Sequence, residues 1–336
     1  MPPDRWTLAL ETGALDLPAG RVLVMGARPR ADLAALGAAE AVTPYYPDHA
    51  WFTEAGCPVS VAPEGEYAAA LIQIVKSKAA SLAMIADALT HLPRHGLLLV
   101  DGQKVEGIES LLKQVRATLP VEDVVSKAHG KLFWLRRPET LPSRVADWVI
   151  EPREVGGGYQ TRPGLFSADG PDPGSELLIA LVPPLKGTIA DLGAGWGYLA
   201  GEILAEQDGI DAMHLVEADW HAVEAARRNV TDPRAEFHWA DATTWVSDAP
   251  LDAVICNPPF HHGRAADPAL GHAFIAAASR LLKPSGRFFM VANKHLPYEA
   301  ALKSAFATGR MLADMNGYKV YEAAKPKRAR GRNKGT

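Results

Sequence analysis

The sequence predicts an α/β protein built from two similar, doubly wound domains. Short apolar runs alternate with helical patterns along the second half, which is typical of βαβ units and a mostly parallel sheet. The first half repeats part of this pattern, because residues 21–26 and 189–193 both run from an apolar strand into a glycine. Residues 91–100 and 281–290 both contain a helix end, a Pro/Gly turn and a buried strand. We therefore interpret the chain as a duplicated domain.

Length and composition are consistent with this interpretation. The 336 residues correspond to about two domains, and 48% hydrophobic with 22% charged residues are typical of a globular protein with a substantial core. A wholly disordered, collagen-like or disulfide-stapled chain is excluded. No apolar run approaches the roughly 18 residues of a membrane span, and the first residues lack the layout of a signal peptide. Cys57 and Cys256 offer no metal cluster, so we expect a cytoplasmic protein without a metal site or a membrane partner.

Proline, glycine and charge mark the expected domain boundaries. Residues 151–174 hold four prolines and six glycines, which indicates a connection rather than an element. From Lys325 onward the chain has six Lys/Arg and no acid, whereas the rest carries 29 basic and 39 acidic residues. This balance argues against indiscriminate nucleic-acid binding and hints at a polyanionic partner for the tail. We predict a first domain at 1–150, a linker at 151–174, a second domain at 175–324 and a disordered basic tail at 325–336.

The second half can be assigned element by element. Apolar runs bounded by turn residues predict strands, and apolar residues at helical spacing predict helices. In order, we expect a strand at 188–190, a helix at 198–206, a strand at 213–216, a helix at 222–229, strands at 236–239 and 253–256, a helix at 269–282 and a strand at 287–292. Met311, Met315, Tyr318 and Tyr321 are assigned to a final hairpin and to the core.

A glycine-rich turn separates the first strand and helix of the second half. Gly193, Gly195 and Gly197 follow Asp191 at alternate positions, so the backbone can turn tightly and a ligand can approach it closely. In a doubly wound sheet this turn lies at the carboxyl ends of the strands, where ligands bind. A dinucleotide fingerprint would need a further glycine at the position of Tyr198. The pattern acid-x-Gly-x-Gly-x-Gly instead resembles motif I of the class I S-adenosylmethionine-dependent methyltransferases.

Three acids follow three consecutive strands at places to which this resemblance gives roles. It implies that Asp191 faces the methionine amino end of the cofactor and that Glu217 accepts both ribose hydroxyls. Asp241, with Ala242 beside it, would contact the adenine. A single acid at a strand end is more often a helix cap or a solvated loop residue. Their common register after successive strands favours binding, and the expected cofactor is S-adenosyl-L-methionine.

The tetrapeptide Asn257-Pro258-Pro259-Phe260 is the most specific motif in the chain. The prolines end the preceding strand, because proline cannot donate to the ladder and restricts its neighbour. That role explains neither the Asn nor the Phe. The amino group of a planar base is a poor nucleophile, since its lone pair is delocalised into the ring. The Asn257 side-chain oxygen and the Pro258 carbonyl would accept its hydrogens while Phe260 stacks on the base, so that catalysis rests on positioning.

Resemblance to known motifs narrows the class of amino group that the protein would methylate. The tetrapeptide is similar to the D/N-P-P-Y/F motif of amino-methyltransferases acting on adenine N6, guanine N2, cytosine N4 or a protein glutamine amide. Residues 164–167 (Gly-Leu-Phe-Ser), 174–178 (Gly-Ser-Glu-Leu-Leu) and 291–298 (Val-Ala-Asn-Lys-His-Leu-Pro-Tyr) occur in order with it. Together they resemble the bacterial ribosomal RNA guanine-N2 methyltransferases of the small-subunit type and their large-subunit relatives, strongly over 160–322 and weakly over 20–137.

This resemblance implies two tandem Rossmann-like methyltransferase domains, of which the N-terminal copy is degenerate and the C-terminal copy is catalytic. It also implies methyl transfer to N2 of a guanine, with ribosomal RNA or an assembling ribosomal subunit as the partner. We expect the protein to be a monomer. Phe166 is expected at the substrate pocket and Trp196 in the core.

Three alternatives remain open from the residues themselves. An amino-methyltransferase with this tetrapeptide could act on adenine N6 or a protein glutamine amide, although the glutamine enzymes are not expected to carry a degenerate N-terminal copy. A non-catalytic RNA-binding assembly factor could retain the fold, although the intact glycine loop argues against it. A nicotinamide oxidoreductase is disfavoured by Tyr198 and by a tetrapeptide that has no role in hydride transfer.

The first half departs from the active pattern. Lys76-Ser77-Lys78 follows the apolar run 70–75, where the second half has an Asn and two prolines, and the loop after Gly26 lacks repeated glycines. We infer that this half binds no cofactor and serves folding or RNA contact. Lys76 and Lys78 could meet RNA phosphates, although each could equally be a solvated surface residue. In the second half, His261, Arg264 and Lys294 are further candidate RNA contacts near the strand ends.

Overall fold

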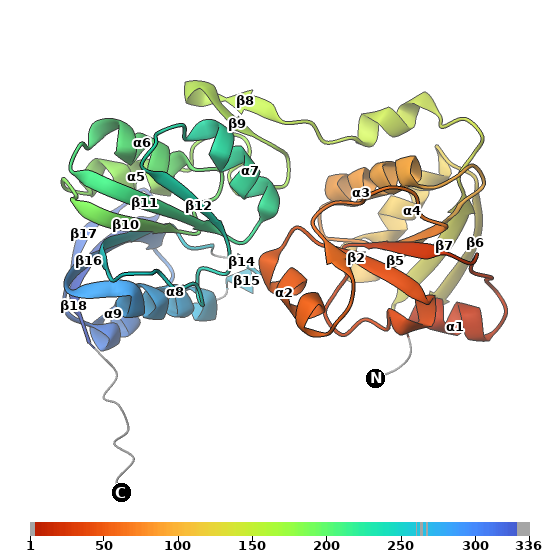
Figure 1. The fold of residues 1–336 in the computed structure, drawn as a ribbon, viewed down its shortest axis with the longest axis horizontal. Helices are drawn as coiled ribbons and strands as arrows, with labels where there is room; N and C mark the ends of the chain where they lie inside the picture. Colours follow the sequence, from red (N-terminus) through yellow and green to blue (C-terminus); the bar gives the residue numbers. More distant parts are fainter. Residues whose placement is uncertain (1–3, 260, 263–264, 267, 328–336) are drawn as a thin grey trace, which may run out of the picture. The chain divides into compact units, whose positions relative to one another are not determined.

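The chain folds into two compact α/β units, each built around its own sheet (Figure 1). The computed structural model describes residues 4–259, 261–262, 265–266 and 268–327. The first unit comprises the chain up to Pro152 together with Arg162–Gly164, and the second comprises Arg153–Thr161 and the chain from Leu165 onward. Within the described ranges, no helix is both long and apolar enough to cross a membrane.

The first unit contains a seven-stranded sheet with the order β3-β2-β1-β4-β5-β7-β6. The five strands from β3 to β5 are parallel, and β7 and β6 complete the sheet as an antiparallel hairpin. The strands are β1 (Arg21–Met25), β2 (Ala38–Val42), β3 (Val59–Ser60), β4 (Ala69–Gln73), β5 (Leu97–Gln103), β6 (Val121–Lys127) and β7 (Gly130–Arg136). The helices are α1 (Arg5–Glu11), α2 (Tyr46–Glu54), α3 (Lys78–His91) and α4 (Ile108–Arg116).

The second unit repeats this topology, with the order β12-β11-β10-β13-β16-β18-β17 and the same change from parallel to antiparallel pairing. The duplication and the tandem Rossmann-like fold are thus confirmed. The strands are β10 (Gly187–Leu192), β11 (Ile210–Glu217), β12 (Ala235–Trp239), β13 (Leu251–Cys256), β16 (Leu282–Asn293), β17 (Phe306–Met315) and β18 (Tyr318–Pro326). The helices are α5 (Pro173–Leu181), α6 (Tyr198–Glu206), α7 (Trp220–Asn229), α8 (Pro268–Leu281) and α9 (Glu299–Ala305). A short pair, β14 (His261–His262) and β15 (Ala265–Ala266), follows β13.

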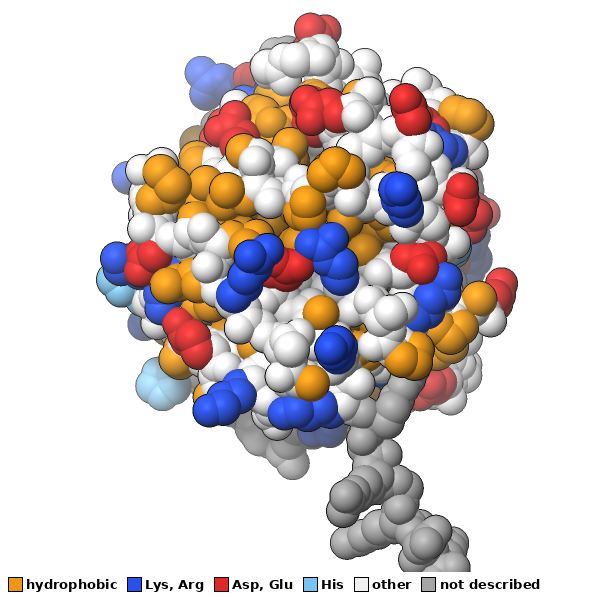
Figure 2. All heavy atoms as spheres, turned by 90° about the vertical axis from the view of Figure 1, so that its left-hand side faces the viewer, with side chains coloured by type: hydrophobic (Ala, Val, Ile, Leu, Met, Phe, Trp, Pro, Cys, Tyr) orange, Lys and Arg blue, Asp and Glu red, His pale blue; other side chains and the backbone are white. Residues whose placement is uncertain are grey.

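The predicted strands and helices of the second half are all present, but the core assignment of two methionines is wrong. Met311 and Met315 lie in the final hairpin with 51% and 49% of their surface exposed, because β17 is the outermost strand of the sheet. Tyr321, on the inner strand β18, is 4% exposed as predicted. On this side of the molecule hydrophobic, basic and acidic side chains are interspersed (Figure 2).

The end of the apolar run at residues 70–75 also differs from the prediction. Strand β4 ends at Gln73, since strand pairing rather than the length of the apolar run sets where a strand stops. Met25 pairs with Ile72 in the first unit as Leu192 pairs with Cys256 in the second. Gln73 therefore occupies the position of Asn257, and the alignment of Lys76 with that position is corrected by three residues.

Two connecting segments contain regular structure. Within the predicted linker, β8 (Arg153–Val155) and β9 (Tyr159–Thr161) form a hairpin that belongs to the second unit. The Asn229 side-chain amide donates to the carbonyls of Gln160 and Trp196, both at 2.8 Å, and so joins this hairpin to α7 and the glycine loop. At the other end, β18 continues through Pro326, which extends the sheet two residues into the segment assigned to the tail. Residues 328–336 of that segment lie outside the described chain.

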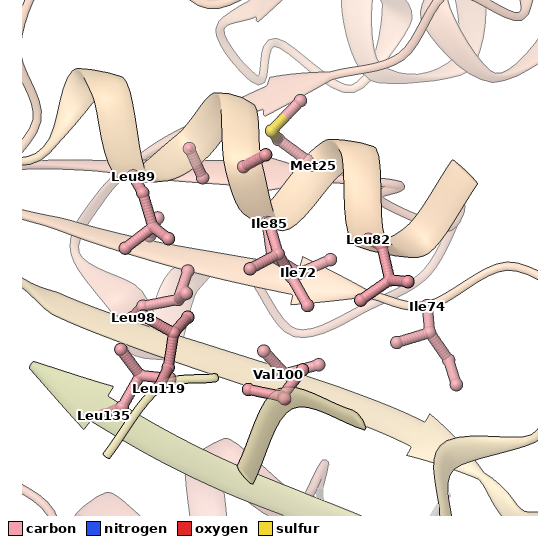
Figure 3. Close-up of a cluster of buried hydrophobic side chains, with 14 of the residues drawn as sticks. Met25, Ile72, Ile74, Leu82, Ile85, Leu89, Leu98, Val100, Leu119 and Leu135 are labelled. Carbon is pink, nitrogen blue, oxygen red and sulfur yellow. The ribbon is translucent and has the colours of Figure 1, made fainter. Parts of the chain in front are cut away.

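Buried side chains explain where polar groups can lie. In the first unit, Leu82, Ile85 and Leu89 recur at helical spacing on α3 and face strand residues such as Ile72 and Leu98 (Figure 3). In the second unit, α8 and α9 cover one face of the sheet, while α5, α6 and α7 cover the other. A parallel sheet buried on both faces has strands that are apolar throughout. Polar functional groups are accordingly placed at the carboxyl ends of these strands.

A buried ion pair gives a test of the first unit. Arg5 on α1 donates from Nε to Oδ1 of Asp101 at 2.5 Å and from Nη2 to Oδ2 at 2.8 Å, and both side chains are under 10% exposed. Asp101→Asn should lower the free energy of unfolding of this unit by about 3–5 kcal/mol, because it leaves the guanidinium buried without a counter-charge. Denaturant unfolding, with hydrogen exchange of β5 and β7 peptides to localise the effect, measures this change.

The matched control is Glu139→Gln in the ion pair with Arg94, whose side chains are 56% and 68% exposed. Exposed pairs contribute at most about 1 kcal/mol. Equal effects of the two substitutions would contradict the role assigned to burial.

Candidate active site

The predicted site residues converge at one edge of the second sheet. Strand order reverses between β10 and β13, which is the switch point where ligands bind in doubly wound sheets. In the parallel register, Leu192 pairs with both Val216 and Cys256, and Glu217 pairs with Trp239. The residues at and just after these strand ends therefore lie on neighbouring strands at the same level. They are Asp191, Gly193, Glu217, Asp241 and Asn257.

The glycine loop connects β10 to α6 through three residues with positive φ. Gly193, Gly195 and Gly197 have φ values of 76°, 56° and 88°, a region that side-chain-bearing residues rarely adopt. A Cβ at Gly197 would lie 2.8 Å from the Val230 side chain. The loop is anchored because the Gly193 N–H donates to the Val216 carbonyl at 2.8 Å. Backbone geometry therefore requires glycine here, as the motif predicts.

Asp191 is a buried carboxyl group without a partner. It has no exposed surface, and neither of its oxygens has a hydrogen-bond partner among the described residues. Burial, and secondarily the charge of Glu217, raises the pKa of Asp191 to about 8. A cationic ligand group beside it would favour the ionised form and offset the cost of burial. The site is thus suited to a ligand that carries positive charge.

Glu217 is held in a fixed orientation at the end of β11. Its Oε2 accepts from the Gly195 N–H at 2.9 Å, and its Oε1 accepts from the N–H groups of Ala218 at 2.7 Å and Asp219 at 2.9 Å. Burial raises its pKa, and these hydrogen bonds act in the opposite direction. A carboxylate offers about four acceptor positions, so the group can bind a further hydroxyl while it remains fixed.

Asp241 has a local structural role in addition to its place at the strand ends. Its Oδ1 accepts from the Thr243 N–H at 2.8 Å and from the Thr243 hydroxyl at 2.6 Å, which closes the turn after β12. Ala242 beside it is buried, at 5% exposure. The two residues lie where the sequence places them, next to the end of the strand that pairs with Glu217.

Asn257 has a fixed side-chain orientation. Its Nδ2 donates to Asp172 Oδ2 at 2.9 Å and to Ser175 Oγ at 2.8 Å. A carboxylate only accepts, so Asp172 determines which end of the amide is the nitrogen. The Asn257 Oδ1 is buried and has no hydrogen-bond partner in the part of the chain that is described. The structure therefore presents an oriented acceptor without a donor.

The sequence assigned no site role to Asp172, and it placed Ser175 only within the family motif at 174–178. Asp172 is also the N-cap of α5, where its Oδ2 accepts from the Ser175 N–H at 2.9 Å and Pro173 occupies the first turn. Asp followed by Pro at the start of a helix is a recognisable capping signal. That signal predicts a helix start but not a contact with a residue 85 positions away.

The glycine loop and Asn257 line one pocket together with Phe166, Asp172 and Ser175. Phe166 is half exposed and Trp196 is 3% exposed, in agreement with the predicted pocket and core positions. The Trp196 Nε1 donates to the Phe166 carbonyl at 2.9 Å, so the buried indole holds the segment that carries Phe166.

The remaining predicted residues are placed less directly. Pro258 is buried and Pro259 is exposed, while Phe260 and Arg264 lie outside the described residues, as does the side chain of His261. Lys294 forms an ion pair with Asp314 at 2.8 Å. Lys76 and Lys78 are exposed in the first unit.

Comparison with known proteins identifies relatives of this chain. The Methyltransferase small domain family matches residues 158–322. A protein of Shewanella pealeana named ribosomal RNA small subunit methyltransferase C is 30% identical over 267 residues, which cover 76% of each chain. A protein of the same name from Pectobacterium atrosepticum is 29% identical over 264 residues, covering 77% of this chain and 76% of that one.

One solved structure is similar over nearly the whole chain. It is the T. thermophilus 16S rRNA N2 G1207 methyltransferase, RsmC, in complex with AdoMet and guanosine. The TM-score is 0.76 at 26% identity, and the match covers 96% of this chain and 92% of that one.

The buried carboxyl of Asp191 predicts a pH dependence of stability. Its pKa in the folded chain, about 8, lies above the value of about 4 for an unfolded chain, so between these values the folded state binds more protons. Stability of the ligand-free protein should therefore fall as the pH rises from about 4 to about 8. Asp191→Asn should remove this contribution and raise the free energy of unfolding near pH 7 by roughly 1–4 kcal/mol.

The measurement is denaturant unfolding of the ligand-free protein and the variant across this pH range. Asp169→Asn, at an exposed carboxyl of the same unit, is the control and should follow the unsubstituted chain. Parallel pH profiles for Asp191→Asn and the unsubstituted chain would contradict the assignment.

Proposed function

The chain belongs to the ribosomal RNA small subunit methyltransferase C family, and on this basis we propose that it methylates N2 of a guanine in 16S ribosomal RNA. The methyl donor is S-adenosyl-L-methionine. The observation that carries the proposal is the Asn257 side chain, whose buried Oδ1 lacks a donor while its Nδ2 is bound by Asp172 and Ser175. An exocyclic amino group supplies the missing donor.

The residues around the glycine loop fit S-adenosyl-L-methionine. Asp191 is a buried carboxyl without a partner, which suits the cationic methionine end of the cofactor. A Cβ at Gly195 would meet nothing within 4 Å, so this position leaves room for close approach, and the oriented Glu217 carboxylate has an acceptor position left for a ribose hydroxyl. Asp241 and Ala242 are proposed to contact the adenine. When bound, the sulfonium supplies an activated methyl group.

We assign the chemistry of the protein to positioning. The Asn257 Oδ1 and the Pro258 carbonyl accept the two hydrogens of the guanine amino group and direct its lone pair towards the methyl donor. The rigid Pro258-Pro259 segment fixes these acceptors relative to the end of β13. Holding a near-attack geometry contributes several kcal/mol to a transfer of this kind. Asp172 and Ser175 act through Asn257 as positioning residues.

The substrate base must leave the RNA stack to reach this pocket. Extruding a base costs a few kcal/mol, which aromatic stacking offsets in part. Phe166 is half exposed at the pocket and is available for such a contact. We propose the same role for Phe260. The T. thermophilus enzyme acts on G1207, and the equivalent guanine is the first position to examine for this chain.

We propose that RNA recognition rests on local basic groups. The face of the second unit in Figure 2 mixes basic with acidic and apolar side chains, so it offers no single-sign surface among its described residues. Lys294 lies at the end of β16, beside β13, and would exchange its ion pair with Asp314 for a phosphate. His261, Arg264, the tail and the first-unit residues Lys76 and Lys78 remain candidate contacts. Ribosomal RNA as substrate also implies action in the bacterial cytoplasm. We further propose that the protein acts as a monomer.

The main experiment is transfer of radiolabelled methyl groups to 16S RNA and to small subunits that lack the modification. We expect label in RNA, recovered after digestion as N2-methylguanosine. Comparison of naked RNA with assembled subunits identifies the preferred substrate. Recovery of label only in N6-methyladenosine or only in protein would overturn the proposal, as would cofactor binding without transfer to either substrate.

The Asn257 assignment predicts a separation of binding from catalysis. Asn257→Ala should reduce turnover by about 10²–10³-fold, the effect of removing one oriented polar group from a reacting centre, with little change in cofactor affinity. Asp172→Asn should also lower turnover, because an amide partner no longer determines the orientation of Asn257. Single-turnover kinetics and calorimetric titration with the cofactor measure the two quantities.

Asp169→Asn is the matched control, because Asp169 lies in the same segment with 94% of its side chain exposed. Equal losses of turnover and cofactor affinity in Asn257→Ala would make Asn257 a structural residue.

A further inference from the structure

Two histidines and a glutamate of the second unit form a cluster that the proposed methyl transfer does not use. His214 lies on β11, and Glu236 and His238 lie on the neighbouring strand β12. One ligand atom of each residue lies within 4.8 Å of the other two. We propose that these three side chains bind a divalent transition-metal ion of the Zn²⁺ type.

The parallel register brings the three side chains together. His214 pairs with Glu236, and Val216 pairs with His238. Side chains two positions apart share a face of a strand, so Glu236 and His238 lie on the same face of β12. The three residues therefore form a triangle on one face of two adjacent strands. In the sequence, His214 and Glu236 are 22 positions apart, and no spacing motif connects them.

The distances between the ligand atoms are compatible with one shared ion. The His214 Nδ1 lies 3.0 Å from the His238 Nε2 and 3.1 Å from the Glu236 Oε2. Ligand atoms of a tetrahedral zinc ion, with bonds of about 2.0–2.1 Å, lie roughly 3.3 Å apart. Small side-chain movements would place all three atoms at bonding distance from one ion. Without an ion, the His214 Nδ1 lies within hydrogen-bonding distance of both an imidazole nitrogen and a carboxylate oxygen.

Neighbouring groups hold the rings in place. The Trp245 ring centroid lies 5.4 Å from that of His214 and 5.0 Å from that of His238. Glu236 is 54% exposed, so an ion can reach the cluster from solvent.

The donor set selects the class of ion. Two imidazoles with one carboxylate suit zinc and similar transition metals, whereas Mg²⁺ and Ca²⁺ prefer six or more oxygen ligands. Three protein ligands leave a fourth position for water. The bound ion would join β12, which lies at the edge opposite β17, to β11. His238 is three residues before Asp241, and His214 is three residues before Glu217. We assign it a stabilising role at this edge, independent of methyl transfer.

The test is titration of the metal-stripped full chain with Zn²⁺ against a chelating dye, and with Co²⁺ by visible absorption. We expect one ion per chain and the absorption bands of a tetrahedral Co²⁺ site. Loss of an outer-shell partner weakens metal affinity by about 10–100-fold. His214→Gln and His238→Gln each remove a direct ligand, so each should weaken binding by more than this. Glu236→Gln removes the charge of the carboxylate ligand at an exposed position, so it should also weaken metal binding while the fold is unchanged. Zn²⁺ should also raise the unfolding midpoint of the unsubstituted chain but not of these variants.

His272→Gln and Glu206→Gln are the controls, because both side chains are exposed helix positions of the same unit. They should leave metal affinity unchanged. Binding that persists in both His214→Gln and His238→Gln would place the ion elsewhere and overturn the proposal, as would failure of the unsubstituted chain to compete with the dye. Neither readout depends on methyl transfer, so the two proposals can fail separately.

Discussion

The alignment of parallel strand ends is the constraint on which the site depends. Because β11, β10 and β13 pair in parallel, Val216, Leu192 and Cys256 lie at one level, and the residues that follow them share one edge of the sheet. Both faces of this sheet are covered by helices, so the interiors of the central strands β10 and β13 are largely apolar and the polar groups of the site lie at that edge. The glycine loop, the acids and the tetrapeptide are far apart in sequence and become neighbours for this reason alone.

The site retains polar groups that the ligand-free fold does not satisfy. The Asp191 carboxyl and the Asn257 Oδ1 are buried without hydrogen-bond partners among the described residues, and each such group costs about 1–3 kcal/mol. Their partners in our proposal are the cationic end of the cofactor and the amino group of the base. The Asp172 carboxylate accepts from the Asn257 Nδ2 and so prevents a flip of the amide. The Asn257 Oδ1 therefore remains without a donor at the pocket that Asn257 lines.

The first unit has the same topology, but the polar groups at the corresponding strand ends have hydrogen-bond partners within the unit. Gln73 stands at the position of Asn257, and its Oε1 accepts from the Arg28 N–H at 3.0 Å. The Arg28 guanidinium donates to the Ile74 carbonyl at 2.7 Å and pairs with Glu106. A Cβ at Gly26 would lie 2.3 Å from the Gln73 carbonyl oxygen, so this loop packs against its own strand end. These internal contacts support the inference that the first unit serves folding or RNA contact rather than cofactor binding.

The sequence by itself determined the α/β class, the duplication, the glycine loop and the acids after successive strands, because these follow from local periodicity and turn chemistry. It also identified Asn257, since prolines after an apolar strand are a local signal. Only the tertiary structure decided what orients Asn257, because Asp172 is 85 residues away and its local pattern is that of a helix cap. It likewise decided that Met311 is exposed and that His214 meets His238. Edge position and strand register arise from pairing between distant segments, which local sequence patterns do not record.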